Sequence, residues 1–213
     1  MTTEYPAPGL KSALERLPRP GASVLDLGPA LGANIRYFGG VGARVRIADF
    51  ERSIDDEGAR EAIPAIWERK LVHLLPFDDG ERFDLVLAWD LANYLGRERW
   101  PAVVRRIVDR LEPGGAFHLL ARVGAEMPAR PSLFRIVEPG VVSEQMIATK
   151  MVPAPRLPHA EIEKMNPGLV APRSHLGKSG MQEYVLEHSA AHNLPPRAVA
   201  KPRQRPPRAT IGT

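Results

Sequence analysis

The most informative segment of the chain is Val24-Leu-Asp26-Leu-Gly28-Pro-Ala30-Leu-Gly32-Ala-Asn34. It overlaps a short apolar run at Ser23–Leu27, which is typical of a buried strand, and it leads into a short helix expected around Asn34–Phe38. Glycines in such a turn let the backbone come close to a ligand, and the free N–H groups at a helix start favour an anionic group. The stretch therefore predicts a ligand site between a strand and a helix.

A second candidate residue, Asp49, follows the next predicted strand, Ala43–Ala48. It lies 21 positions after Gly28, and an acid about 20 residues beyond such a glycine can accept hydrogen bonds from both hydroxyls of a ribose. Phe50, beside it, could lie against a purine ring. Each signal alone has a structural explanation as well: a tight turn before a helix needs glycine, and an Asp at a strand end is often a helix cap.

Strand and helix signals alternate through the first two thirds of the chain. Further strands are predicted at Leu71–Leu75, Phe83–Trp89 and Ala116–Ala121, and such alternation is typical of a parallel sheet with helices on both faces. Near the end, Leu169–Leu176 and Met181–Glu187 are joined by a short glycine-containing segment. This forces antiparallel pairing, because a parallel crossover needs about a dozen residues or more.

In these features the sequence resembles the class I S-adenosylmethionine-dependent methyltransferases. Asp26 to Gly32 is similar to their first motif, an acid, one residue and then Gly-x-Gly-x-Gly, with Ala30 in place of the middle glycine. Leu111-Glu-Pro-Gly-Gly resembles their lead into the fifth strand, and the closing hairpin resembles their antiparallel last strand. The resemblance implies an α/β fold: a Rossmann-like methyltransferase sheet, mostly parallel with a terminal antiparallel hairpin, and helices on both faces.

The resemblance also implies S-adenosylmethionine as the cofactor and a reaction site at the end of the fourth strand. There, Asp90 could face the cofactor's amino group or act as a base, while Asn93 and Tyr94 could orient the acceptor. Equally, Asp90 could cap the next turn while Asn93 and Tyr94 pack locally. The catalytic candidates are thus Asp90, Asn93 and Tyr94, and the implied cofactor-binding residues are Asp26, Gly28, Pro29, Ala30, Gly32, Asp49, Phe50 and Asp90.

The sequence departs from the family pattern in two places. The family's acid at the end of the third strand has no clear match in Leu71–Leu75, where His73 could take its place, or backbone groups and apolar contacts could hold the adenine. Ala30 adds a methyl group where the ligand would approach. Two further polar residues are open to interpretation: His118 is predicted to be a core histidine, whereas Arg122 could meet an acidic acceptor or be solvated.

We expect a methyltransferase-like domain over residues 1–188, with a substrate lid at about 122–157, and a disordered, basic, Pro-rich tail over residues 189–213. The tail has five basic residues, five prolines and no acid, so it cannot bury enough apolar surface to offset its ordering entropy. It accounts for the net charge of +4, because the rest of the chain is near neutral. Such a tail could bind nucleic acid or an acidic protein, or only aid solubility.

The function that these features predict is transfer of a methyl group from S-adenosylmethionine to a small or medium-sized acceptor by in-line displacement. One alternative is a non-catalytic scaffold on a degenerate methyltransferase fold, and another is a nicotinamide-dependent oxidoreductase, which predicts a further parallel strand in place of the closing hairpin. The chain has no cysteine, which excludes disulfides and thiolate zinc sites, and no other metal-ligand spacing is present. Without an apolar run of about 18 residues or a visible secretory signal, we expect a cytoplasmic protein without a membrane contact. The oligomeric state is left open.

Overall fold

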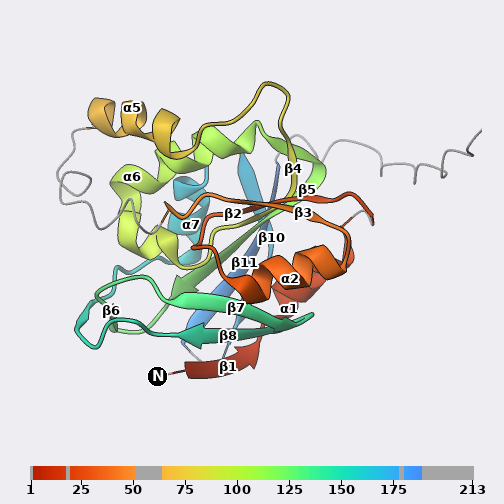
Figure 1. Ribbon diagram of the computed structural model, residues 1–213. Coiled ribbons are helices and arrows are strands. Elements are labelled where there is room, and N and C mark those ends of the chain that lie inside the picture. The colour runs from red at the N-terminus through yellow and green to blue at the C-terminus, as the bar shows by residue number, and fades with distance from the viewer. Residues whose placement is uncertain (1, 18–19, 51–63, 178–179, 189–213) are drawn as a thin grey trace, which may run out of the picture.

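The computed structural model describes residues 2–17, 20–50, 64–177 and 180–188. Its centre is a six-stranded sheet in the order β10-β11-β5-β4-β2-β3 (Figure 1). The four strands from β3 to β5 are parallel, and β11 and β10 are antiparallel to their neighbours. This is the predicted sheet with its terminal hairpin. The strands are β2 (Ser23–Asp26), β3 (Arg44–Ile47), β4 (Phe83–Leu87), β5 (Leu111–Arg122), β10 (Leu169–Leu176) and β11 (Met181–His188).

Helices cover both faces of this sheet, as predicted. Successive residues of a strand point to opposite faces, so Val24 packs with α1 and α2, whereas Leu25 packs with α5, α6 and α7. Both faces are thereby buried, which is typical of the central strands of a parallel sheet. The helices are α1 (Pro8–Glu15), α2 (Gly32–Gly40), α5 (Pro64–Leu74), α6 (Leu91–Val108) and α7 (His159–Met165).

The predicted third strand at Leu71–Leu75 is wrong, because these residues belong to or directly follow helix α5. Trp67, Leu71 and Leu75 are buried and lie four residues apart, which is the spacing of one helix face. The apolar residues within Leu71–Leu75 are too few to distinguish the period of a helix from that of a strand. The helical spacing becomes visible only when Trp67 is included. His73 lies on the exposed face of the helix, so it does not take the place of an acid at a strand end.

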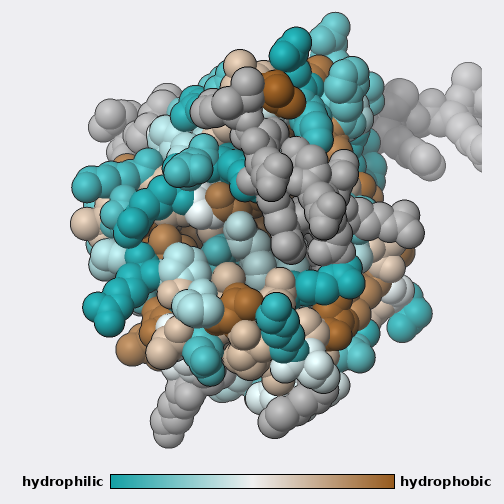
Figure 2. Space-filling view, turned by 90° about the vertical axis from the view of Figure 1, so that its left-hand side faces the viewer, coloured by the Kyte–Doolittle hydropathy of each residue, from teal (hydrophilic) through white to brown (hydrophobic). Residues whose placement is uncertain are grey.

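The predicted lid contains two small sheets beside the main one. β7 (Leu133–Glu138) and β8 (Val141–Gln145) form a hairpin, and β6 (Glu126–Pro128) pairs with β9 (Met151–Pro153). No sequence pattern predicted β1 (Thr2–Pro6), which pairs with β8 and completes a three-stranded sheet, β1-β8-β7. Figure 1 shows this sheet below the main one, and Figure 2 shows apolar surface gathered in the lower half of the face that carries β6.

Parts of the predicted organisation lie outside the described residues. The tail at residues 189–213 is one of them, and residues 53–63, the first part of a segment up to 69 in which one or two helices are expected, are another. The division into a domain at residues 1–188 and a tail therefore stays a prediction. In the described part of the chain, no helix is long and apolar enough to cross a membrane.

Candidate functional site

The carboxylate of Asp26, at the end of β2, is enclosed by hydrogen-bond donors. Its Oδ1 accepts from the backbone N–H of Gly28 at 2.9 Å and from the indole Nε1 of Trp89 at 2.6 Å, while Oδ2 accepts from Nδ2 of Asn34 at 3.3 Å. Burial raises the pKa of Asp26, and the bonds from Trp89, Gly28 and Asn34 act in the opposite direction. The Gly28 amide, which we expected to face a ligand, is thus engaged by the protein itself.

Trp89 follows β4 and is the residue of this site that the sequence analysis passed over. Its ring stacks on Phe134 with the ring centres 5.4 Å apart and the planes 7° from parallel. Its φ of 47° lies in the left-handed region, which costs a residue other than glycine about 1–3 kcal/mol. A Cβ atom on Gly28 would lie 2.9 Å from the Trp89 Nε1, so this glycine is required by the indole.

Little free space is left beside the glycine turn. The cavity there is about 10 Å³ and is lined by residues that include Gly28, Pro29, Trp89, Asp90 and Phe134. Such a volume holds about one water molecule. The turn and its acid have the chemistry expected of a donor site, but in this conformation S-adenosylmethionine does not fit beside Gly28.

The other residues expected to bind the cofactor are placed around the same turn. Asp49 lies beside it, because the N–H of Ala48 bonds to the carbonyl of Asp26 at 2.8 Å and the N–H of Phe50 bonds to that of Leu27 at 2.9 Å. The Phe50 side chain, however, is fully buried and packs edge-on against Trp67 with the ring centres 6.0 Å apart. In this conformation it is a core residue and not a surface for a purine. Pro29 is half-buried, and Ala30 and Gly32 are exposed.

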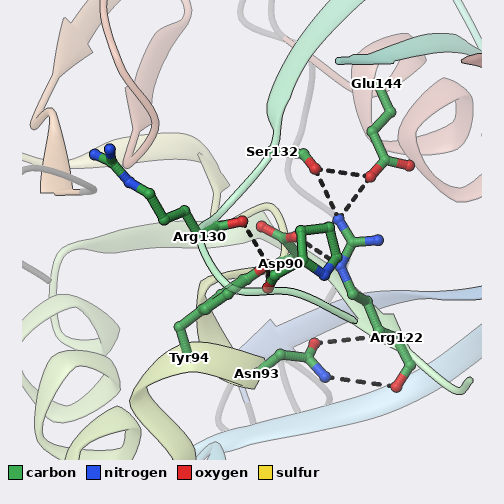
Figure 3. Close-up of polar contacts among 8 residues, drawn as sticks. Asp90, Asn93, Tyr94, Arg122, Arg130, Ser132 and Glu144 are labelled. Atoms are coloured by element: carbon green, nitrogen blue, oxygen red, sulfur yellow. Dashed lines mark hydrogen bonds and ion pairs between the residues drawn. The ribbon is translucent and has the colours of Figure 1, made fainter. Parts of the chain in front are cut away.

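A second cluster surrounds Arg122, at the end of β5 (Figure 3). Its Nε and Nη2 donate to Oδ2 of Asp90 at 2.9 and 2.7 Å, and Nη2 also donates to Oε1 of Glu144 at 2.6 Å. Ser132 donates to the same Glu144 oxygen at 2.8 Å. One buried guanidinium therefore serves two buried carboxylates, which come from the end of β4 and from β8.

Burial and the charges in this cluster shift the pKa values of the groups within and beside it. Burial raises the pKa of Asp90 to about 6, with Arg122 lowering it and Glu144 raising it. Oδ1 of Asp90 is buried and has no hydrogen-bond partner among the described residues, and the same holds for the hydroxyl of Tyr5 on β1. Burial and the two carboxylates raise the pKa of Tyr5 far above its ordinary value. Asp90, which is among the residues that line the cavity beside Gly28, thus has one oxygen without a partner in the described part of the chain.

The remaining two catalytic candidates brace the backbone around this cluster. The side-chain amide of Asn93 accepts the Arg122 N–H at 3.1 Å and faces the Arg122 carbonyl at 3.5 Å. The hydroxyl of Tyr94 lies 2.8 Å from the carbonyl of Arg130 and 3.1 Å from that of Pro128, in the lid. Both Asn93 and Tyr94 therefore make local packing contacts, which is one of the two alternatives that the sequence left open for them. Asp90 precedes α6, but its side chain makes no capping bond.

Two expectations about polar residues near the site can now be judged. Arg122 is neither solvated nor free for an acidic acceptor, since Asp90 and Glu144 hold its guanidinium. His118 is a fully buried core histidine, and its Nε2 lies 2.7 Å from Glu183. Among the described residues no group of His, Cys, Asp or Glu is arranged to hold a metal ion.

Comparisons with known proteins agree with this architecture. Residues 3–136 match a family model described as a methyltransferase domain. Among solved structures, the PH0226 protein from Pyrococcus horikoshii OT3 is 13% identical, with 85% of this chain and 87% of that chain covered and a TM-score of 0.50. CcbJ methyltransferase from Streptomyces caelestis is 16% identical, with 86% and 90% covered and a TM-score of 0.47.

A glycopeptide N-methyltransferase, MtfA, complexed with S-adenosyl-L-methionine is 15% identical, with 84% and 85% covered and a TM-score of 0.46. The comparison with curated proteins finds no match. The family match confirms the Rossmann-like methyltransferase fold that the sequence predicts.

Proposed function

Because this chain belongs to the methyltransferase-domain family, we propose that it transfers a methyl group to a small or medium-sized acceptor at the end of β4. It is a methyltransferase that depends on S-adenosylmethionine, and S-adenosylmethionine is its cofactor. That cofactor supplies a methyl group already activated for displacement, so the protein has to align the acceptor and exclude water.

The observation that supports this site is the unpaired Oδ1 of Asp90. This oxygen is buried and has no partner among the described residues, and Asp90 is one of the residues that line the cavity beside Gly28. A carboxylate whose pKa is raised to about 6 is ionised near neutral pH and can still accept a proton. We therefore assign Asp90 as the group that receives the proton of an acceptor hydroxyl or amine.

The neighbours of Asp90 are assigned a positioning role. Arg122 fixes Oδ2 of Asp90 with two hydrogen bonds, which leaves Oδ1 as the oxygen that can receive a proton. Asn93 holds the backbone of Arg122, and Tyr94 holds the lid at residues 128–130. The acceptor would then lie between the end of β4 and the lid, a covered place that favours a small or medium-sized molecule.

The test is methyl transfer from isotopically labelled S-adenosylmethionine. The protein is incubated with the labelled donor and a small-molecule cell extract, and mass spectrometry identifies a labelled acceptor. Asp90→Asn should form the same product at a much lower rate, whereas the exposed Asp79→Asn should match the wild type. A wild-type protein that binds the donor but labels no acceptor in any extract would contradict catalysis.

A non-catalytic scaffold is the second candidate function, and the filled cavity beside Gly28 favours it. This alternative predicts that the folded protein gives no heat with S-adenosylhomocysteine in isothermal titration, even at high micromolar concentration. It also predicts binding of nucleic acid or an acidic protein that is lost when residues 189–213 are deleted. That partner, like a cytoplasmic location, stays a prediction from the sequence.

A further inference from the structure

The indole of Trp89 occupies the space that a ligand of the Gly28 turn requires. Its Nε1 donates to Asp26 at 2.6 Å on one side, and its ring lies flat against Phe134 on the other. The side chain is only 3% exposed, and the cavity that remains is about 10 Å³. The crevice predicted from the sequence is therefore present, but a side chain of the protein fills it.

We propose that Trp89 is a displaceable plug of the donor site: its indole bonds to Asp26 when no ligand is bound, and it leaves when S-adenosylmethionine binds. This inference rests on the proposed function, because it takes the Gly28 turn as the donor site. It adds that donor binding competes with an internal hydrogen bond. The left-handed backbone of Trp89 is consistent with a residue held in place by its surroundings, since such a conformation persists only where packing enforces it.

The chemistry of Asp26 determines which ligands can displace the indole. When Trp89 leaves, a carboxylate that is 1% exposed loses a hydrogen bond to its Oδ1. Leaving a buried charge without that partner is unfavourable. The incoming ligand must therefore bring an N–H donor to the same oxygen, and an ammonium group is the best replacement because it also carries positive charge. The plug thus selects ligands that have the amino-acid end of the donor.

Movement of Trp89 is linked to the lid. Phe134, on which the indole stacks, belongs to β7. Asn34 ties the same strand to the site: its amide donates to Asp26 and to the Phe134 carbonyl at 3.1 Å, and its oxygen accepts the N–H of Ile136 at 2.9 Å. Donor binding should therefore loosen β7 at the same time as it expels the indole.

The test compares the affinity of three folded proteins for S-adenosylhomocysteine by isothermal titration. Trp89→Phe keeps a ring against Phe134 but removes the competing N–H, so it should bind about fivefold more tightly than the wild type, the equivalent of one net hydrogen bond. Trp100→Phe is the matched control. Trp100 is also buried and also donates from Nε1, to Asn166 at 3.0 Å, but it is not among the residues that line the cavity. Its affinity should equal that of the wild type.

The outcomes separate this inference from the proposed function. Binding by the wild type with equal or weaker binding by Trp89→Phe overturns the plug and leaves the donor site intact. No binding by either protein overturns the donor site and the plug together. Tighter binding by both Trp89→Phe and Trp100→Phe also overturns the plug, because the gain would then be a general effect of losing a buried indole.

Tryptophan fluorescence tests the selection by the amino-acid end. S-adenosylhomocysteine should shift the emission of the wild type and of Trp100→Phe to the red as an indole enters water, and it should not shift that of Trp89→Phe. 5′-Methylthioadenosine, which has the nucleoside but no amino group, should leave the emission of all three proteins unchanged. A red shift of the wild type with 5′-methylthioadenosine would overturn the requirement for an ammonium group.

Discussion

Arg122 donates two hydrogen bonds to a single oxygen of Asp90, at 2.9 and 2.7 Å, and the other oxygen of that carboxylate has no partner among the residues that the structure describes. The pair is buried, so neither group can exchange its partner for water. The arrangement fixes the carboxylate in place, and the residue that carries it lines the cavity beside Gly28.

The rate of methyl transfer should rise with pH through about 6, the pKa of Asp90, because only the ionised carboxylate can receive a proton. Asp90→Asn should lower kcat by about 100-fold and remove this rise. The measurement is kcat/KM against pH with the labelled acceptor. A profile of Asp90→Asn with the same rise near pH 6 would show that another group titrates.

Arg122→Met should destabilise the fold strongly, because it leaves two buried carboxylates without their cation. The expected loss is about 3–5 kcal/mol in the free energy of unfolding, measured by urea denaturation. The control is Arg105→Met, which removes an exposed ion pair with Glu68 at 3.4 Å and should cost less than about 1 kcal/mol. Equal losses in the two variants would contradict the buried role of Arg122.

Asp90 should also make the fold less stable as the pH rises. Its pKa in the folded chain, about 6, lies above its ordinary value of 3.8, so the stabilisation that it contributes is complete below 3.8 and is lost as the pH rises through about 6. Asp90→Asn should remove this loss. Urea denaturation at several pH values between about 4 and 8 measures it, and parallel curves for the two proteins would refute the shift.

Glu183 should have the opposite effect on stability. Burial would raise its pKa, but the hydrogen bond and charge of His118 and the N–H groups of Gly9 and Leu10 hold the pKa below its ordinary value of 4.5. Its contribution is thus present above pH 4.5 and is lost as the pH falls through the lower folded value. Glu183→Gln should make the free energy of unfolding depend less on pH in the acid range, whereas the exposed Glu138→Gln should follow the wild type.

Asn34→Ala should weaken the link between β7 and the glycine turn. The change removes partners from the Phe134 carbonyl, the Ile136 N–H and one oxygen of Asp26, and each buried group left unpaired costs about 1–3 kcal/mol. Hydrogen exchange of the β7 amides should become faster, and the free energy of unfolding should fall. Ile35→Ala, on the exposed side of the same helix, should change neither quantity.

The sheet was predictable from the sequence because its signals are local. The glycine turn after Asp26 and the short connection between β10 and β11 each determine the geometry of adjacent segments. The end of helix α5 was mistaken for a strand because Leu71–Leu75, with only four apolar residues, is too short to reveal a period. β1 gave no signal, since its partner β8 lies more than 130 positions away in the chain.

The site was only half predictable for the same reason. Asp26, Asp49 and Asp90 come at strand ends, where the sequence pattern places ligand-binding residues. Glu144 and Ser132 lie in the lid, and no spacing rule connects them to Asp90 or Arg122. Trp89 was missed because a tryptophan after an apolar strand reads as core. Only the fold brings its indole against Gly28 and Asp26.

Because α5 stands where the sequence suggested another strand, β3 is bonded on one side only, to β2, within the described part of the chain. An edge strand with unpaired backbone groups can pair with a strand of a second molecule, which is a first step towards aggregation. Two of the four residues of β3 are arginines: Arg46 is paired with Glu81, whereas Arg44 is exposed, so the Arg44 side chains repel each other when two such edges meet. Replacing Arg44 with threonine should leave the monomer folded but make it prone to aggregate on storage, a liability to bear in mind when the chain is shortened or its surface is redesigned.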